Sequence, residues 1–308
     1  MIRYESVKKK LLSPLMINGT MLATREIINI YIDDQLVSEI SPLPGLHNEN
    51  ISTSKKYVQR FIENHFTSYE LKNAQLGDGF LFGLYPNLEN EIASYPPSSV
   101  FSIELLLLNL IHKKQYKSMN FCILDFNAEK YSQKKKGVIK IKIGRNSLDK
   151  DIQKINYYID NTKLLFRLDG NQRFLAKNLH ELIKTIPKDR IQYLEEPFIS
   201  KKELENYIKN YDSTIPLAID ENLNNNNSFL ITELPRQIKY GVIKPNLIGG
   251  ISKALKMSAI LKRHGIKTVI SSSFEGEIGI KTLNNIHFIY PDSFCDHPGL
   301  DTLKYFQT

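Results

Sequence analysis

Charged side chains stand at the ends of several short apolar runs in the second half of the chain. Two lysines, three carboxylates and a further lysine occupy such places: Lys140, Lys142, Asp169, Glu195, Asp220 and Lys244. Carboxylate oxygens are the ligands that Mg²⁺ prefers, and the absence of cysteine and histidine from the set argues against structural zinc. A lysine near a divalent cation and a second ammonium has a lowered pKa and can accept a proton near neutral pH. The residue types therefore indicate metal-assisted removal of a proton.

The alternation of side chains along each run predicts the direction in which these groups point. In the run 137–143 the isoleucines share one face and both lysines share the other. Isoleucines suit the outer face of a sheet covered by helices, so we expect the lysines to point inward. The same parity places three polar residues of the run 166–171 on one inward face: Arg167, Asp169 and Asn171.

Each of these residues taken alone has an ordinary structural explanation. A strand-end Asp is usually a helix cap, a Glu before proline is usually a loop carboxylate, and a Lys-x-Lys sequence is usually a solvated edge. Six such charges with matching parity on consecutive strands are different, because burying them without a ligand costs several kcal/mol each. The set as a whole favours a functional site.

The spacing of the apolar runs predicts the element that positions these groups. From residue 120 onward, β-branched runs alternate with polar, helix-compatible segments at intervals of roughly 20 to 30 residues, as in repeated β–α units. We expect strands at 121–126, 137–143, 164–169, 191–195, 217–220, 241–244 and 268–272, with a weaker eighth strand at 286–290. Seven or eight such units indicate a closed parallel barrel with its site at the carboxyl ends of the strands.

The first part of the chain has a different pattern. Residues 24–32 and 36–41 predict an antiparallel strand pair joined by Asp33-Asp34, and residues 54–68 and 99–113 predict helices. We therefore expect an α+β capping domain over residues 1–115 and a (β/α) barrel domain over 116–308, with the C-terminal tail a candidate for packing onto the cap.

Composition excludes several classes of function. The net charge is +8, but the lysines are scattered, and the densest cluster, Lys134-Lys135-Lys136, lacks the interleaved aromatics of a nucleic-acid surface. We expect no nucleic-acid partner, although a positive field can attract a small anionic substrate. The two cysteines lie far apart and Cys122 stands in an apolar run, which favours a buried thiol over a disulfide. Without a signal-like N-terminus or an apolar stretch of about 20 residues, the expectation is a cytoplasmic protein with no membrane partner.

The charged motifs closely resemble those of the enolase superfamily, in the branch that holds muconate-lactonising enzymes and o-succinylbenzoate synthases. The motifs are Lys140-Ile-Lys142, Asp169-Gly-Asn171, Glu195-Glu-Pro197, Asp220-Glu221 and Lys244-Pro245. The resemblance implies a modified TIM-type (β/α) barrel with an N-terminal α+β capping domain. It also implies that Asp169, Glu195 and Asp220 bind Mg²⁺, that Lys142 is the base, and that Lys244 faces the other side of the substrate. A lysine base beside Mg²⁺ is a known arrangement in that superfamily.

Three further stretches resemble the o-succinylbenzoate synthases in particular: residues 39–45, 269–275 and 298–302. That resemblance implies a carbon–oxygen lyase of menaquinone biosynthesis, which dehydrates the small anionic substrate 2-succinyl-6-hydroxy-2,4-cyclohexadiene-1-carboxylate to o-succinylbenzoate. Expected substrate contacts are Lys140, Arg167, Asn171, Ser271 and Ser272. For the two serines, which would hold the succinyl carboxylate, a helix cap is an equally ordinary interpretation.

Two alternatives remain open at the level of sequence. The first is an N-succinylamino acid racemase or dipeptide epimerase of the same branch, which uses the same two lysines; the epimerases carry an Asp-x-Asp pair where residues 294–298 here read Phe-Cys-Asp-His-Pro. The second is a non-catalytic barrel that binds an anionic partner through its basic surface. That hypothesis does not explain why three carboxylates converge at one place. Residues 16–23 are expected to close over the site, and they carry no charge.

Overall fold

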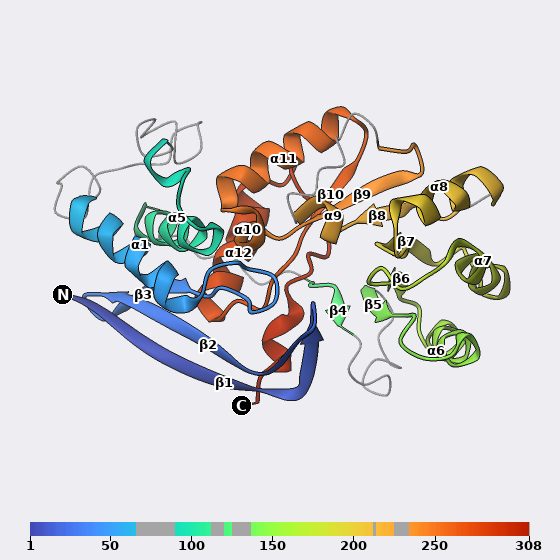
Figure 1. Ribbon diagram of the computed structural model, residues 1–308, viewed down its shortest axis with the longest axis horizontal. Helices are drawn as coiled ribbons and strands as arrows, with labels where there is room; N and C mark the ends of the chain where they lie inside the picture. Colours follow the sequence, from blue (N-terminus) through green and yellow to red (C-terminus); the bar gives the residue numbers. More distant parts are fainter. Residues whose placement is uncertain (66–89, 112–119, 125–136, 212–213, 225–233, 308) are drawn as a thin grey trace.

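Two sheets organise the part of the chain that the computed structural model describes, residues 1–65, 90–111, 120–124, 137–211, 214–224 and 234–307 (Figure 1). A three-stranded antiparallel sheet lies in the N-terminal part, and a seven-stranded parallel sheet forms the rest of the framework. The Lys134-Lys135-Lys136 cluster, the last residues of both predicted N-terminal helices and the end of the run 121–126 lie outside the described residues.

The N-terminal sheet contains the two predicted strands and one long strand that was not predicted. Its strands are β1 (Ile2–Ile17), β2 (Thr20–Ile32) and β3 (Gln35–Ile40), in the order β1-β2-β3. Asp33 and Asp34 turn the chain with φ angles of 47° and 63°, which Asp tolerates better than most residues. We missed β1 because only one of its faces packs on the molecule and its other face is rich in lysine, so its apolar alternation is weak.

Two helices cover this sheet close to the predicted positions. They are α1 (Ile51–His65) and α5 (Pro97–Ile111). Helix α5 is buried from Ser98 to Leu108, which explains its nearly continuous apolar sequence. Its one carboxylate, Glu104, is fully buried and accepts hydrogen bonds from the backbone N–H groups of Ile251 and Ser252. Ile251 and Ser252 begin a later helix, α11 (Ile251–Arg263). The dipole of that helix and the free N–H groups of its first turn compensate the buried charge of Glu104.

The parallel sheet contains all seven predicted strands in the predicted order. They are β4 (Ile123–Leu124), β5 (Val138–Lys142), β6 (Leu165–Asp169), β7 (Ile191–Glu195), β8 (Leu217–Ile219), β9 (Ile238–Ile243) and β10 (Lys267–Ile270). The hydrogen-bonded order follows the chain from β4 to β10, so each crossover leads to the next strand. This arrangement is the repeated β–α pattern that the sequence predicts.

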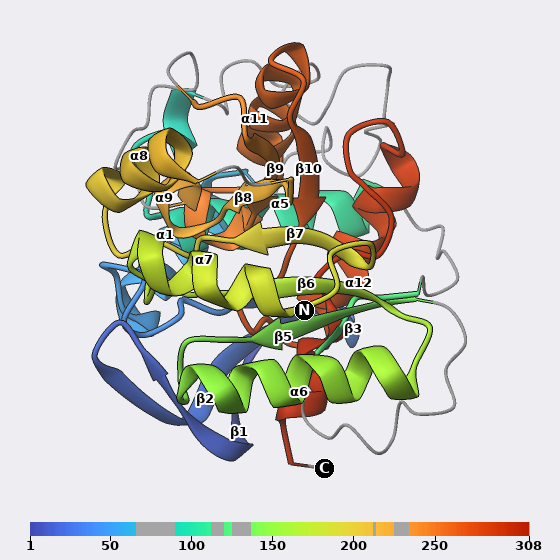
Figure 2. The same ribbon diagram turned by 90° about the vertical axis from the view of Figure 1, so that its right-hand side faces the viewer.

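Helices cover the outer face of the curled sheet, and Figure 2 shows three of them on the side of the sheet that faces the viewer. They are α6 (Leu148–Asn161), α7 (Ala176–Thr185) and α8 (Lys201–Asn210). Two short helices and two longer ones follow the later strands: α9 (Glu221–Asn224), α10 (Pro245–Ile248), α11 (Ile251–Arg263) and α12 (Glu277–Ile289). The isoleucines of β5 are buried under these helices, as the parity argument predicts.

The prediction of an eighth strand at 286–290 is wrong. Residues 286–289 are the last turn of α12, whose Ile286 is fully buried, and a short apolar run fits a buried helix as well as a strand. The edges of the sheet are instead linked by Pro298 and Gly299. Ser271 forms a parallel bridge with Gly299, and the N–H of Cys122 donates to the oxygen of Pro298 at 2.9 Å. These two residues take the place of an eighth strand.

The C-terminal residues lie between the two sheets and against the cap (Figure 1). After the 3₁₀ helix η3 (Asp301–Tyr305), Phe306 forms an antiparallel bridge with Leu11, and the N–H of Gln307 donates to the oxygen of Lys10 at 2.8 Å. Leu11, Leu22, Leu43, Tyr305 and Phe306 form a buried cluster of their own. The contacts agree with a tail that packs on the cap, while the division into 1–115 and 116–308 stays a prediction.

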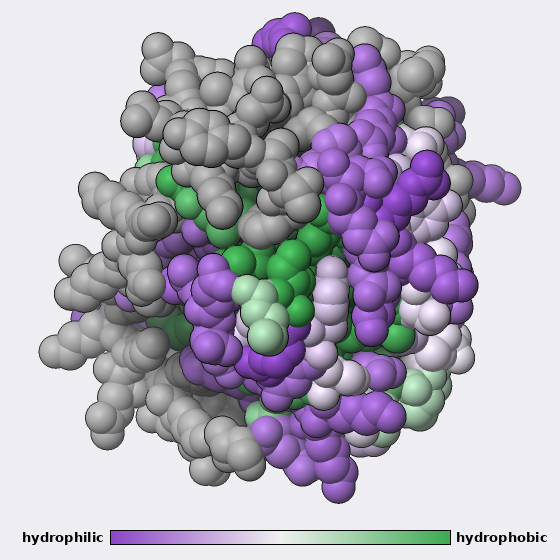
Figure 3. All heavy atoms as spheres, turned by 90° about the vertical axis from the view of Figure 1, so that its left-hand side faces the viewer, coloured by the Kyte–Doolittle hydropathy of each residue, from purple (hydrophilic) through white to green (hydrophobic). Residues whose placement is uncertain are grey.

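The surface of the protein and the state of its two cysteines agree with the composition. Hydrophilic side chains cover much of the coloured surface on the face that Figure 3 shows, and apolar side chains gather near its centre. None of the helices in the described ranges has the length and apolar character to cross a membrane. Cys122 and Cys295 are both free thiols, and Cys122 is buried, as expected.

Candidate active site

The strand register brings the charged residues together at the carboxyl ends of neighbouring strands. Lys142, the last residue of β5, lies opposite Asp169, the last residue of β6, and Asp169 lies opposite Glu195, the last residue of β7. Asp220 directly follows β8, and Lys244 directly follows β9. In a parallel sheet all these ends meet at one edge.

Lys140 neutralises two of the carboxylates from below. Its Nζ lies 2.9 Å from Asp169 Oδ2 and 2.6 Å from Glu195 Oε1, and the two carboxylate side chains are only 2% and 1% exposed. Burial acts to raise the pKa of Asp169, but the charges of Lys140 and Lys142 outweigh it, and that pKa lies below its ordinary value. Burial acts to lower the pKa of Lys140, but the carboxylates hold it well above its ordinary value. This ammonium is therefore charged at neutral pH.

Lys244 and Asp220 form the second ion pair of the cluster. Asn224 connects the two residues, because its Nδ2 donates to Asp220 Oδ1 at 2.8 Å and its Oδ1 accepts from the backbone N–H of Lys244 at 2.9 Å. Burial raises the pKa of Glu195 to about 8, with Lys140 acting against this rise and the charges of Asp169 and Asp220 adding to it. Three carboxylates thus share one buried region with two ammonium groups.

Lys142 differs from the other two lysines because it has no hydrogen-bond or ion-pair partner among the described residues. Burial lowers its pKa to about 8; Asp169 opposes the shift, while the positive charges of Lys140, Arg145 and Lys244 add to it. A lysine with such a pKa exists partly as the free amine near neutral pH and can accept a proton.

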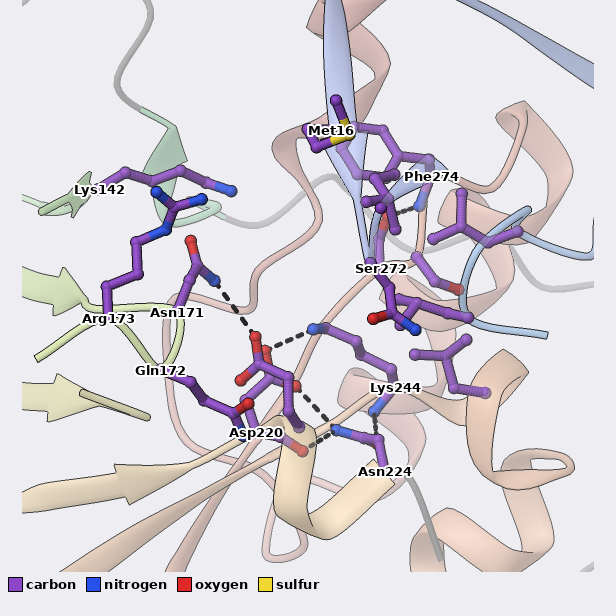
Figure 4. A pocket seen from close by; sticks show the side chains of 18 of the residues that line it. Met16, Lys142, Asn171, Gln172, Arg173, Asp220, Asn224, Lys244, Ser272 and Phe274 are labelled. Carbon is purple, nitrogen blue, oxygen red and sulfur yellow. Dashed lines mark hydrogen bonds and ion pairs between the residues drawn. The ribbon is translucent and has the colours of Figure 1, made fainter. Parts of the chain in front are cut away.

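A cavity of about 360 Å³ opens above this cluster (Figure 4). Lys142 enters it from one side and Lys244 from another, and Asp220 lies on its floor. The cap contributes the turn between β1 and β2, residues 16–19, so the predicted closing segment does line the cavity, as a hairpin end. The two lysines can therefore contact different sides of one small bound molecule.

The donor set fits a hard cation. Asn171 Oδ1 and Glu221 Oε2, both buried at the cavity floor, accept no hydrogen bond from the described residues. Buried acceptors without partners are costly, and a cation or its water would satisfy them. Among the described residues, however, no three acidic, cysteine or histidine side chains are gathered as a ready-made cage, because the ammonium groups of Lys140 and Lys244 lie against the carboxylates. The chemistry of the oxygens fits Mg²⁺, and binding would require these lysines to move aside.

The structure divides the expected substrate contacts into two groups. Asn171 and Ser272 line the cavity, whereas Lys140, Arg167 and Ser271 do not. Arg167 is buried and donates to Gln192 Oε1 at 2.7 Å and to the backbone oxygens of His297 and Asp296 at 2.8 and 3.2 Å. These bonds hold the chain after β10 against the barrel interior.

The serine hydroxyls are engaged in holding the wall of the cavity. Ser271 Oγ donates to the oxygen of Gly299 at 3.2 Å. Ser272 Oγ lies 2.5 Å from Thr302 Oγ1 and accepts from the N–H of Phe274 at 3.0 Å. Both serines thus fasten residues 299–302, the segment that closes the sheet.

Sequence reasoning missed several residues of the cavity lining. They are Arg145, Gln172, Arg173, Asn224, Leu46, Leu247 and Phe274. A usable signal exists for the arginines, because each follows a charged strand end within four residues, where the loops of a barrel form the site. The apolar residues come from the cap (Leu46), from α10 (Leu247) and from the segment after β10 (Phe274), and their meeting depends on tertiary packing.

Comparison with known proteins places this geometry in context. The model of the family described as enolase C-terminal domain-like matches residues 126–302. The o-succinylbenzoate synthase of Pasteurella multocida (strain Pm70) is 26% identical over 311 residues, which cover 94% of this chain and 86% of that protein.

Solved structures share the fold. The L-Ala-D/L-Glu epimerase of Bacillus subtilis, in a substrate-liganded complex, has a TM-score of 0.74 at 18% identity, covering 100% of this chain and 91% of that chain. The dipeptide epimerase of Enterococcus faecalis V583, complexed with Mg and L-Leu-L-Tyr, has a TM-score of 0.72 at 17% identity over 100% and 91% of the two chains. These likenesses confirm the predicted fold class, a modified barrel with an N-terminal cap.

Proposed function

We propose that this chain, which belongs to the enolase C-terminal domain-like family, is an o-succinylbenzoate synthase. The reaction is loss of water from 2-succinyl-6-hydroxy-2,4-cyclohexadiene-1-carboxylate, a small anionic substrate, as a step of menaquinone biosynthesis. The family membership supports chemistry at a carbon next to a carboxylate. The choice of this reaction within the family rests on the sequence motifs and on the synthase relatives, which are about a quarter identical.

The observation that carries the proposal is one cavity with two lysines on different sides and carboxylates beneath it. Lys142 has a lowered pKa and no described partner, so it can take a proton. Lys244 is paired with Asp220 and has a raised pKa, because Asp220 and Glu221 outweigh the effect of burial, so it stays positive. One base and one cation that keeps its charge are the components needed to remove a proton and hold the resulting negative charge.

Each residue has a role in the proposed reaction. Asp169, Glu195 and Asp220 would hold Mg²⁺, which when bound supplies positive charge to the ring carboxylate and to the charge that develops as the adjacent proton leaves. Lys142 takes that proton, and the hydroxyl group on the neighbouring ring carbon then departs. Lys142 can return its proton to the departing hydroxide, so that water leaves and the ring becomes aromatic. Lys244 lies on the other side of the ring as a cation–π partner.

Racemisation or epimerisation of an N-acylated amino acid is the second candidate. Lysines on two sides of one cavity favour it, because removal of a proton from one face and its return on the other need two such groups. Against it, residues 294–298 read Phe-Cys-Asp-His-Pro and lack the Asp-x-Asp pair that the dipeptide epimerases of this branch carry. The likeness to the solved epimerases is a likeness of fold.

The decisive test adds the cyclohexadiene substrate to the purified protein with and without Mg²⁺ and follows the ultraviolet absorbance of the aromatic product. We expect product only with the metal. If no product forms while deuterium from solvent appears at the α carbon of an N-succinylamino acid or a dipeptide, the second candidate replaces the first. Nucleic-acid binding without either activity would contradict both.

A further inference from the structure

We propose that Arg145 and Arg173 form an anion site in the wall of the catalytic cavity and bind a second carboxylate of the substrate, remote from the carbon that loses its proton. The inference deepens the proposed function, on which it rests: the substrate class becomes dicarboxylates with an apolar centre. It also relocates the contact that the sequence assigned to Ser271 and Ser272.

The two arginines lie on adjacent loops at the top of the barrel. Arg145 is the third residue after Lys142, which ends β5, and Arg173 is the fourth after Asp169, which ends β6; both line the cavity. Figure 4 shows Arg173 on the same side of the cavity as Lys142, with Ser272 and Phe274 across from them.

A glycine permits the close approach of these loops. Gly144, next to Arg145, has a φ of 76°, and a Cβ added there would lie 2.7 Å from the ring of Phe174 and 3.1 Å from Cβ of Arg173. The positive φ and the short distances both require glycine. The residue before Arg145 is thereby packed directly against the loop that carries Arg173.

Hydrogen bonds hold both loops in place. The N–H of Gly144 donates to the buried Asp151 at 2.6 Å. The N–H of Arg173 donates to Gly170 at 3.1 Å, and the N–H of Phe174 donates to Pro197 at 2.8 Å. A fixed backbone lowers the entropic cost of presenting two long side chains to one anion.

The arginines that are buried or half-buried are bound inside the protein, whereas Arg145 and Arg173 are exposed and can bind a ligand. Arg25, Arg167 and Arg190 each donate to backbone carbonyls. Neither Arg145 nor Arg173 has a hydrogen-bond or ion-pair partner among the described residues, and both line the same cavity. A wall of like charges without counter-ions favours an anionic ligand, and guanidinium groups match carboxylates with paired hydrogen bonds.

The opposite wall offers no comparable site. Ser271 and Ser272 already use their hydroxyls on Gly299 and Thr302, and the lysine on that side, Lys244, is paired with Asp220. Apolar residues also line the cavity: Leu43, Leu46, Leu247 and Phe274. A molecule with an apolar ring between two carboxylates would lie with its ring against these residues and its remote carboxylate at the arginines.

The test compares two ligands by calorimetry in the presence of Mg²⁺, so that turnover is not needed. The ligands are o-succinylbenzoate and its derivative with the succinyl carboxylate converted to a primary amide. The protein variants are the wild type, Arg145→Gln, Arg173→Gln and the double variant. We expect each single change to weaken o-succinylbenzoate binding by about 10- to 100-fold, the usual value of a charge-assisted hydrogen bond, and to change amide binding by less than about threefold.

Two matched controls isolate the site. Arg263→Gln removes the same charge from the exposed end of α11, outside the cavity lining, and should leave the binding of both ligands unchanged. Ser272→Ala tests the earlier assignment and should change the affinities of the two ligands by the same factor.

The inference is overturned if the wild type fails to bind o-succinylbenzoate or to prefer it over the amide. It is also overturned if the arginine variants weaken the binding of both ligands equally, or if Ser272→Ala alone abolishes the preference. A wild type that binds with this preference but forms no product would leave the arginine site standing and contradict the synthase reaction instead.

Discussion

Two buried clusters, each combining carboxylates with cationic side chains, contribute to this protein in different ways. The barrel-end cluster contains Lys140, Asp169, Glu195, Asp220 and Lys244 at the carboxyl ends of the parallel strands. The interface cluster contains Arg25, Glu39 and Glu275, where β2 and β3 of the cap meet the chain after β10. The two clusters differ in the groups that their charged side chains bind.

In the interface cluster the charges are bound mainly by the backbone. Arg25 donates to the oxygen of Phe274 at 3.1 Å and to the oxygens of Ser41 and Pro42. Glu39 accepts from the N–H groups of Gly276 and Gly279 at 2.7 and 3.0 Å, at the start of α12. None of these side chains has a buried polar atom without a partner. The cluster joins cap to barrel and holds the cavity wall that contains Phe274.

In the barrel-end cluster the charges face one another, and Asp220 and Lys244 also line the cavity. The neighbouring acceptors of Asn171 and Glu221 lack partners among the described residues, and Lys142 above them has none either. A saturated buried network stabilises a fold, whereas an incompletely saturated one retains the capacity to bind and react. The comparison therefore predicts that substitutions in the two clusters separate stability from activity.

The largest expected effect is on activity, from Lys142→Ala. Loss of the base should lower kcat by about 10³- to 10⁴-fold, and the melting temperature should not fall, because no described partner is lost and a destabilising buried charge is removed. The product assay and a melting curve measure the two quantities. Near-normal turnover in this variant would remove Lys142 from its role.

The next effect is on stability, from Arg25→Met. Two carboxylates would remain buried beside an apolar side chain, so the free energy of unfolding should fall by about 3–5 kcal/mol. Denaturant unfolding measures it, with Arg3→Met as the control. Arg3 pairs with Glu5 at 3.0 Å on the surface, and its loss should cost less than about 1 kcal/mol. Equal losses in the two variants would contradict the comparison.

Asp220→Asn should chiefly weaken the binding of Mg²⁺. The change removes one proposed ligand charge and keeps the shape, so the Mg²⁺ concentration for half-maximal activity should rise by about 10- to 100-fold while the fold is kept. Titration with Mg²⁺ measures this, and circular dichroism checks the fold. An unchanged metal requirement would exclude Asp220 from the ligand set.

The smallest expected effect is the pH dependence of the wild type. The free amine of Lys142 is the active form, and its pKa is lowered to about 8, so kcat/KM should rise about tenfold per pH unit below that value and level off above it. The same lowered pKa makes the stability of the fold depend on pH. Because the folded state binds this proton more weakly than the unfolded state, Lys142 lowers stability below pH 8, and the loss is relieved between about pH 8 and the ordinary value of 10.5. A flat rate profile from pH 6 to 9 would contradict the assignment.

The sequence by itself determined the repeated strands and the direction of their side chains. Parity along β5 placed both lysines opposite the buried isoleucines, and the strand ends located the carboxylates. These features are local, because a two-residue period and an apolar run of limited length are set by neighbours in the chain.

Tertiary structure alone decided which inward-facing groups reach the cavity. Arg167 and Asp169 share a parity, but depth along β6 directs the first to carbonyls near the barrel interior and the second to the cluster at the strand end. The replacement of an eighth strand by Pro298-Gly299, and the packing of Gly144 against Phe174 and Arg173, depend on contacts between distant or separate segments. No local pattern encodes such contacts, because their energy comes from packing that exists only when the whole barrel has closed.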